Sequence, residues 1–351
     1  MRLRRSLWEW SSVKRQRKCG RVPFRSEGGA VIRTSETDQG PRAGVAGIQS
    51  CGSWSCPVCS RKISAERARE VAAVLKAAEA QDCSVAFVTL TFRHRAGTPL
   101  RASWDALTAG WRSVTSGASW SKDQDKFGVI GWLRAVELTH GDHGFHVHCH
   151  AMIVFDTRVS PDIMFALGDR LFGRWEKGLA RKGFSAIADR GGLDVRPVQL
   201  TADSIESLAT YISKAAMEAV NASGKAARGS GSRAPFQILR DAVGTGSADD
   251  IELFWEIEQA SAGRKKITWS TSLREWAGLH RERTEEEIVT EDQHGEDQLV
   301  LPRETWERVQ HEAEDLLDII ELEGLPGAER WLRSRGLAYR VVDPGRGKAD
   351  E

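Results

Sequence analysis

The sequence predicts an α+β fold, with a mostly antiparallel central sheet flanked by helices, a Cys-rich module before it and a small helical tail after it. Two strand-like segments, residues 128–140 and 144–155, are joined by the short turn "GDHG", which is typical of an antiparallel hairpin. Helical segments separate the other strand-like runs, and the composition changes on both sides of this region. The predicted parts are therefore a module at 1–62, a central domain at 63–279 and an accessory region at 280–351.

The elements of the central domain follow from the spacing of its apolar residues. Residues 64–80 repeat apolar side chains at helical spacing among residues that favour helices. The segment "SVAFVTLTFRH" at 84–94 is dense in β-branched and aromatic residues without a helical period, so it predicts a buried strand. By the same criteria the chain continues as helix 102–114, loop 115–127, strand 128–140, strand 144–155, helix 161–178, strand 193–200, helix 201–220 and strand 265–270.

The two outer parts have less regular patterns. Residues 1–62 are rich in Gly, Ser, Arg and Cys with little periodicity, which suits a small module held by something other than a large core. Residues 283–298 are strongly acidic and predict a linker. A helix is expected at 303–323, ending at Gly324 and followed by a short tail unit.

The formal net charge of +1 conceals an uneven distribution. Residues 280–351 contain 20 acidic and 10 basic side chains, whereas residues 1–33 contain ten Lys or Arg and two Glu. A basic arm attracts phosphate backbones, so nucleic acid is the leading partner class, although a solvated terminus explains the charge equally well. For the acidic end, autoinhibition by mimicry of DNA and plain solubility both remain open. No stretch approaches the ~18 apolar residues of a membrane span, and no signal peptide is evident, which predicts a cytoplasmic protein.

Histidines are concentrated in one predicted strand, since five of the nine fall within residues 140–150. Because side chains alternate across a strand, His146, His148 and His150 share one face. The strand continues into the apolar run "AMIVF", which favours a metal site in a buried sheet over the alternative, a polar surface facing solvent. Glu137 lies on the preceding strand of the hairpin and can supply a carboxylate. Imidazole with carboxylate suits Mn²⁺ or Mg²⁺ as well as zinc.

The six cysteines lie in a chain that shows no export signal, which favours metal binding over disulfides. Cys56 and Cys59 have the C-x-x-C spacing that lets two thiolates reach one tetrahedral zinc, and Cys51 lies shortly before them. Free thiols are the alternative. Three cysteines suggest that a fourth completes the zinc site. Cys83 is a weak candidate for this fourth ligand because it opens a buried strand. Four thiolates would leave no open position, so the zinc would be structural.

The histidine strand resembles the metal motif of a known family, the rolling-circle replication initiators of plasmids within the HUH endonucleases, and particularly their actinobacterial type. In that motif two histidines flank a bulky apolar residue and precede three apolar residues, as His148, His150 and residues 151–153 do. Cys149, between the histidines, is smaller than usual. The segments "FVTLT", "RAVELTHG" and "ITWSTSLR" are similar as well, and the likeness covers residues 15–278.

The resemblance implies an HUH, ferredoxin-like sheet that holds one divalent cation, Mg²⁺ or Mn²⁺. Its ligands would be His148, His150 and Glu137, with His146 as a supporting residue or a third donor. The resemblance also implies that Cys19, at the place of a cysteine in actinobacterial relatives, is the fourth ligand of a structural Zn²⁺.

Tyr211 and Tyr339 are the two tyrosines of the chain. Tyr211 lies in "TYISK", which resembles the family's nucleophile motif, a helical tyrosine followed three residues later by a lysine, here Lys214. The resemblance implies attack on a phosphodiester, which leaves a 5′-phosphotyrosine and releases a 3′-hydroxyl that a polymerase can extend. Lys214 would stabilise phosphoryl oxygens or favour the phenolate.

The residue that activates water for the terminating cleavage is left open. Some members of the family carry a glutamate one helical turn before the tyrosine, where this chain has Ser207. Glu206 is expected to form a capping box with Asp203, and Glu218 lies two turns further on, so neither is assigned.

These patterns together predict a replication initiator that nicks one strand at a plasmid origin. A single-tyrosine transposase or relaxase would use the same chemistry in another DNA context, whereas a zinc-dependent DNA-binding regulator would need no covalent step. The expected partner is plasmid origin DNA, single-stranded or in a hairpin. Because the chain has no G-x-x-x-x-G-K-[ST] phosphate loop, strand separation would need a host helicase, and a host polymerase would extend the new end.

Overall fold

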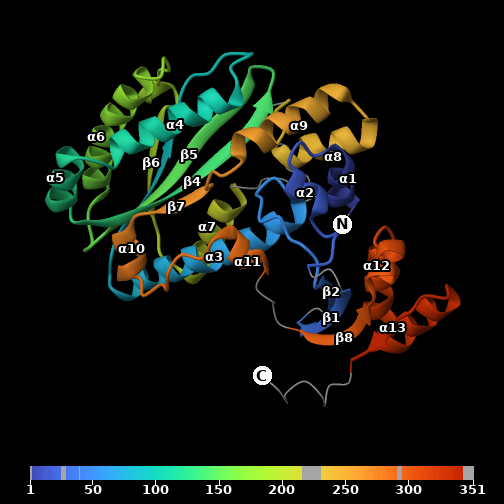
Figure 1. The fold of residues 1–351 in the computed structure, drawn as a ribbon. Coiled ribbons are helices and arrows are strands. Elements are labelled where there is room, and N and C mark those ends of the chain that lie inside the picture. Colours follow the sequence, from blue (N-terminus) through green and yellow to red (C-terminus); the bar gives the residue numbers. More distant parts are fainter. Residues whose placement is uncertain (1, 25–28, 39, 216–230, 291–294, 343–351) are drawn as a thin grey trace. The chain divides into compact units, whose positions relative to one another are not determined.

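The computed structural model describes residues 2–24, 29–38, 40–215, 231–290 and 295–342 (Figure 1). The chain forms two compact units, of which the larger is Ser60–Arg283 and the smaller joins Met1–Cys59 to Thr284–Glu351. The three-part division into 1–62, 63–279 and 280–351 stays a prediction. That the two ends of the chain share one unit is a feature that the sequence did not predict.

The larger unit is built on a five-stranded sheet with the strand order β6-β3-β5-β4-β7. Every neighbouring pair in this order is antiparallel, and β4 and β5 form the predicted hairpin. The predicted α+β class with a mostly antiparallel central sheet is therefore confirmed. The strands are β3 (Val85–Leu90), β4 (Val129–Gly141), β5 (Gly144–Phe155), β6 (Leu193–Val198) and β7 (Ile267–Trp269).

The register of the sheet decides which side chains share a face. On β5, His148 lies opposite Glu137 of β4, and His150 lies opposite Thr89 of β3. Since cross-strand partners point to the same side and side chains alternate along each strand, these four residues lie on one face of the sheet. Cys149 lies on the other face and is fully buried.

Helices cover both faces of the sheet (Figure 1). On the Cys149 side lie α4 (Leu100–Val114) and α6 (Pro161–Ala180), and the ring of Trp111 in α4 meets Trp132 of β4 at 4.9 Å between centroids. On the histidine side lie α7 (Ala202–Ala215) and α3 (Pro57–Ala80), joined by a hydrogen bond of 2.7 Å from the Ser64 hydroxyl to the Ser213 carbonyl. The helix predicted at 64–80 thus forms and begins earlier, at Pro57.

Residues 115–127 were expected to form a loop, and this prediction is wrong because α5 (Ala118–Phe127) forms there. Asp123 of α5 is fully buried and accepts hydrogen bonds from Arg170 and Arg174 of α6, both at 2.6 Å. This ion-pair network stabilises a helix whose own sequence is rich in loop-forming residues. The other helices of the larger unit are α8 (Pro235–Thr245), α9 (Ala248–Ser261) and α10 (Thr271–Trp276).

The smaller unit contains a four-stranded sheet with the order β2-β1-β8-β9. Strand β1, from the N-terminal end of the chain, pairs antiparallel with β8, from the C-terminal end. Its strands are β1 (Ala30–Thr37), β2 (Gly40–Ala46), β8 (Glu296–Leu301) and β9 (Arg340–Val341). Its helices are α1 (Arg2–Trp10), α2 (Lys14–Lys18), α11 (Glu285–Thr290), α12 (Arg303–Val309) and α13 (Ala313–Ser334).

An apolar core joins the two ends of the chain in this unit. Ala30 and Ile32 of β1 are fully buried against apolar side chains from β8, α12 and α13. Trp306 of α12 is also fully buried, and its indole N–H donates to the Arg21 carbonyl at 2.8 Å. The N-terminal segment therefore obtains apolar partners from the far end of the sequence, which its own composition could not reveal.

Two details of the C-terminal region differ from the prediction. The acidic segment 283–298, expected as a linker, contains α11 and the start of β8, because the strand edge of β1 and the shared core give it partners. The helix expected at 303–323 is divided into α12 and α13, and α13 kinks at Gly324, where φ is 67° and ψ is −168°. Glycine adopts this conformation without the steric cost that other residues meet. Within the described ranges, no helix is long and apolar enough to cross a membrane.

Candidate active site

The hairpin of β4 and β5 brings a carboxylate between two imidazoles. Glu137 Oε2 lies 3.1 Å from His148 Nε2 and 2.7 Å from His150 Nε2. One ligand atom from each of these residues lies within 4.8 Å of the other two, which is the arrangement that a metal ion requires. We call Glu137, His148 and His150 the Glu-His-His centre.

The electrostatics of the Glu-His-His centre favour the protonation states that bind metals. Burial by itself raises the pKa of Glu137, but its hydrogen bonds with His148 and His150 outweigh burial and bring this pKa to about 2. Burial lowers the pKa of His150, against the opposing influence of Glu137. An ionised carboxylate beside a neutral imidazole leaves a lone pair on each group, as metal binding requires.

Tyr211 of α7 reaches the same centre from outside the sheet. Its hydroxyl lies 3.4 Å from His150 Nε2, and its ring meets that of His150 at 5.4 Å between centroids, at 64° between ring planes. The side chain remains accessible, with 42% of its surface exposed. The helix carries Lys214 as well, whose side chain lies outside the described part of the structure. The phenol is therefore close to the proposed ligands and open to a substrate.

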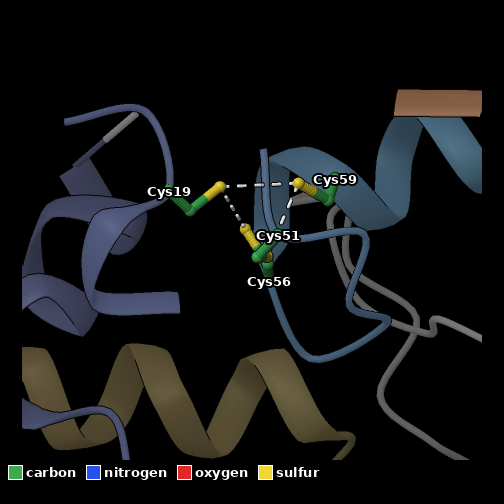
Figure 2. Close-up of side chains that lie close together, drawn as sticks. All are labelled: Cys19, Cys51, Cys56 and Cys59. Atoms are coloured by element: carbon green, nitrogen blue, oxygen red, sulfur yellow. Dashed lines mark hydrogen bonds between the residues drawn. The ribbon is translucent and has the colours of Figure 1, made fainter. Parts of the chain in front are cut away.

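Cys19, Cys51, Cys56 and Cys59 meet in the smaller unit, where we call them the four-cysteine cluster (Figure 2). All four are buried, and the Sγ atoms of Cys19 and Cys59 lie 3.5 Å apart. The other close Sγ pairs are Cys19 with Cys56 at 3.7 Å and Cys51 with Cys59 at 3.6 Å. A tetrahedral site with Zn–S bonds of about 2.3 Å has sulfur atoms about 3.8 Å apart. Hydrogen bonds among the four thiols lower the pKa of Cys59 and that of Cys19, which favours the thiolate form at both.

Comparison with known proteins identifies the chain. The model of a family described as "Replication protein" matches residues 43–315, which is most of the sequence. The chain belongs to this replication-protein family. The replication protein is also 28% identical to "Protein rep" of Streptomyces lividans, in a match that covers 81% of this chain and 77% of the relative. No solved structure matches. The resemblance to plasmid replication initiators, drawn above from the histidine strand, is confirmed.

The matched segment of the replication protein contains the Glu-His-His centre, Tyr211 and three members of the four-cysteine cluster. Cys19 precedes the matched segment, and the structure nevertheless brings its thiol to the other three. Cys83 and Cys149 are buried outside the cluster. Burial raises the pKa of the Cys149 thiol to about 12.

His146 lies beside the Glu-His-His centre without joining the set of converging ligand atoms. Its Nδ1 lies 3.5 Å from His94 Nδ1, and its ring centroid lies 4.9 Å from that of His148. Burial, followed by the neighbouring imidazoles of His148 and His94, lowers the pKa of His146 to about 4. Its part as a ligand or a supporting residue stays a prediction.

The start of α7 differs from the predicted capping box. Thr201 and Ser204 bond each other reciprocally, from the Thr201 amide to the Ser204 hydroxyl at 2.9 Å and from the Ser204 amide to the Thr201 hydroxyl at 3.3 Å. Asp203 and Glu206 were expected to form the capping box. Thr201 is the N-cap residue instead, because it directly precedes the helix, which begins at Ala202. Glu206 is exposed, and Glu218 lies outside the described residues, so neither is assigned to the terminating cleavage.

Two residues of β3 contact the centre and were not predicted from the sequence. Thr89 Oγ1 lies 3.0 Å from His150 Nδ1, and the ring of Phe87 stacks on that of His150. Both belong to the segment "FVTLT", whose alternation places them on one face of the strand. That alternation was visible, but the strand's position next to β5 was not.

Proposed function

We propose that this replication protein nicks one strand of plasmid origin DNA through Tyr211 and remains covalently attached to the new 5′ end. The observation that supports this most directly is the 3.4 Å separation between the Tyr211 hydroxyl and His150 Nε2, a ligand atom of the Glu-His-His centre. A nucleophile next to a charge-stabilising site is what phosphodiester cleavage needs.

Glu137, His148 and His150 would hold the divalent cation, Mg²⁺ or Mn²⁺. Two imidazole nitrogens and one carboxylate oxygen form a mixed donor set that suits Mn²⁺ or Mg²⁺ as well as zinc, and the convergence of these atoms within 4.8 Å fits one ion. When bound, the cation polarises a phosphoryl oxygen and offsets the charge that develops there.

In the proposed reaction the Tyr211 oxygen attacks the phosphorus, and the bond from phosphorus to the 3′ oxygen breaks. The phosphate is transferred to tyrosine as a 5′-phosphotyrosine, and the phenol proton ends, in the net balance, on the 3′ oxygen. The 3′-hydroxyl so released can serve as a primer for a host polymerase. Lys214, three residues further along α7, is the proposed cation for the phosphoryl oxygens or the phenolate.

The four-cysteine cluster is proposed to hold a structural Zn²⁺. Its sulfur spacing is close to that of a tetrahedral thiolate site, and all four of its cysteines are buried, as is typical of a structural zinc. The basic segment 1–33, which contains Cys19, would contact the phosphates of origin DNA. Strand separation is assigned to a host helicase, since the sequence contains no phosphate loop of the P-loop type.

The test uses Tyr211→Phe, which removes one hydroxyl and keeps the ring. Purified protein is incubated with Mn²⁺ and labelled single-stranded oligonucleotides that tile the replicon encoding it. The unaltered protein should give a protein-linked 5′ product, and Tyr211→Phe should give none. Tyr339→Phe is the matched control, because Tyr339 is in the smaller unit and its hydroxyl contacts Glu329 and Arg333. If Tyr211→Phe nicks DNA at the rate of Tyr339→Phe, Tyr211 is not the nucleophile, and the protein acts on DNA without the proposed covalent intermediate.

A further inference from the structure

His150 is held by two side chains of β3, the strand on the opposite side of β5 from β4. The Thr89 hydroxyl lies 3.0 Å from His150 Nδ1, and the Phe87 ring stacks on the imidazole at 5.2 Å between centroids and 18° between planes. The register explains both contacts, because Thr89 pairs directly with His150 and Phe87 lies two residues before Thr89 on the same face. The His150 imidazole is thus contacted at its edge by Thr89 and on its face by Phe87.

His148, the other imidazole of the centre, has no comparable hydrogen bond at its buried Nδ1 among the described residues. Its ring meets the rings of His146 and His150, each at 4.9 Å between centroids. The two histidines therefore differ, and the protein orients His150 much more firmly than His148.

We propose that Thr89 and Phe87 are positioning residues that fix His150 and, through it, the place where the Tyr211 hydroxyl meets the metal centre. This inference rests on the proposed function. An acceptor at Nδ1 keeps the ring proton there and leaves the Nε2 lone pair for the cation. The Thr89 hydroxyl can donate or accept, so it is placed to accept from Nδ1–H when the cation occupies Nε2.

Phe87 acts on the nucleophile as well as on the ligand. Its ring lies edge to face with that of Tyr211, at 6.0 Å and 67°, while it stacks on His150. Tyr211 and His150 in turn meet each other, so the three rings form a closed triangle. Phe87 is therefore the shared surface that sets the spacing between the phenol and the ligand, and small errors in such spacing slow a reaction strongly.

The first experiment measures Mn²⁺ affinity by electron paramagnetic resonance of free Mn²⁺, an ion that does not favour the thiolates of the four-cysteine cluster. Thr89→Val keeps the shape of the side chain and removes its hydroxyl, and it should weaken Mn²⁺ binding by about 10- to 100-fold. Thr89→Ser keeps the hydroxyl and should bind Mn²⁺ like the unaltered protein. Thr115→Val is the matched control, because Thr115 lies at the end of α4, on the other side of the sheet, and its hydroxyl donates to the Trp111 carbonyl.

The second experiment measures nicking by Phe87→Leu at saturating Mn²⁺. We expect kcat to fall by about 10-fold or more while KM for the oligonucleotide stays near that of the unaltered protein, because only the spacing of the reacting groups changes. If the unaltered protein binds Mn²⁺ and nicks DNA, yet Thr89→Val matches Thr115→Val in affinity, the positioning inference alone is overturned. If the unaltered protein neither binds Mn²⁺ nor nicks, the proposed function falls and the inference falls with it.

Discussion

Replacing Cys59 by alanine tests whether the four-cysteine cluster is a metal site. Cys59 lies in the first turn of α3, and its Sγ is within 3.6 Å of the sulfur atoms of Cys19 and Cys51. Removing it deletes one corner of the sulfur set and leaves the other three thiols buried. We expect the zinc to be bound far more weakly and the smaller unit to lose stability.

The magnitude follows from the even geometry of the cluster. Structural zinc is bound with roughly 10–16 kcal/mol of apparent free energy in small zinc modules, which is about 3 kcal/mol for each of four equivalent thiolates. The three closest sulfur separations differ by only a few tenths of an ångström, from 3.5 to 3.7 Å, so an equal division is reasonable. Since about 1.4 kcal/mol corresponds to a tenfold change, zinc affinity should fall by about 100-fold or more.

The assay is the zinc content of each chain after dialysis against a competing chelator, together with amide hydrogen exchange. Cys59→Ala should lose zinc under conditions in which Cys83→Ala and Cys149→Ala, which change buried cysteines outside the cluster, retain it. Exchange should rise in β1 and β2 of the smaller unit and stay slow in β3 and β5 of the larger one. Equal zinc retention in Cys59→Ala and Cys83→Ala would refute the assignment of the cluster as a metal site.

Two further changes probe other parts of the molecule. Because the pKa of His146 is lowered to about 4, the unfolded chain binds a proton between pH about 6.5 and 4 that the folded chain does not, so stability falls as the pH falls. His146→Gln should remove about 2 kcal/mol of the loss between pH 7 and pH 5 in denaturant unfolding without added metal, and an unchanged loss would contradict this. Trp306→Ala should cost the smaller unit about 3–5 kcal/mol. It should also speed hydrogen exchange at Ala30 and Ile32, and unchanged exchange there would show that the two chain ends do not share one core.

The sequence by itself indicated much of the local structure and the chemistry of the centre. The hairpin turn and the alternation of histidines predicted β4 and β5, and the structure brings His148, His150 and Glu137 together as the hairpin requires. The apolar spacing of 64–80 predicted the helix α3, and Val71 and Leu75, two of the residues in that spacing, are fully buried. Such patterns are readable because they depend on neighbours a few residues away.

Contacts between segments far apart in the chain could not be predicted from these local patterns. Asp123 of α5 pairs with Arg170 and Arg174 of α6, and the sequence shows no local sign of that pairing. The part played by Thr89 became visible only when β3 was placed next to β5.

The sequence determined which residues could bind metal, attack a phosphate or form a hairpin, because side-chain chemistry and strand alternation are properties of a short stretch of chain. Tertiary structure alone decided that Tyr211 lies beside His150 and that Ile32 shares a core with Leu301. These contacts join segments far apart in the chain, and they form only where the burial they achieve exceeds the entropy lost in closing long loops.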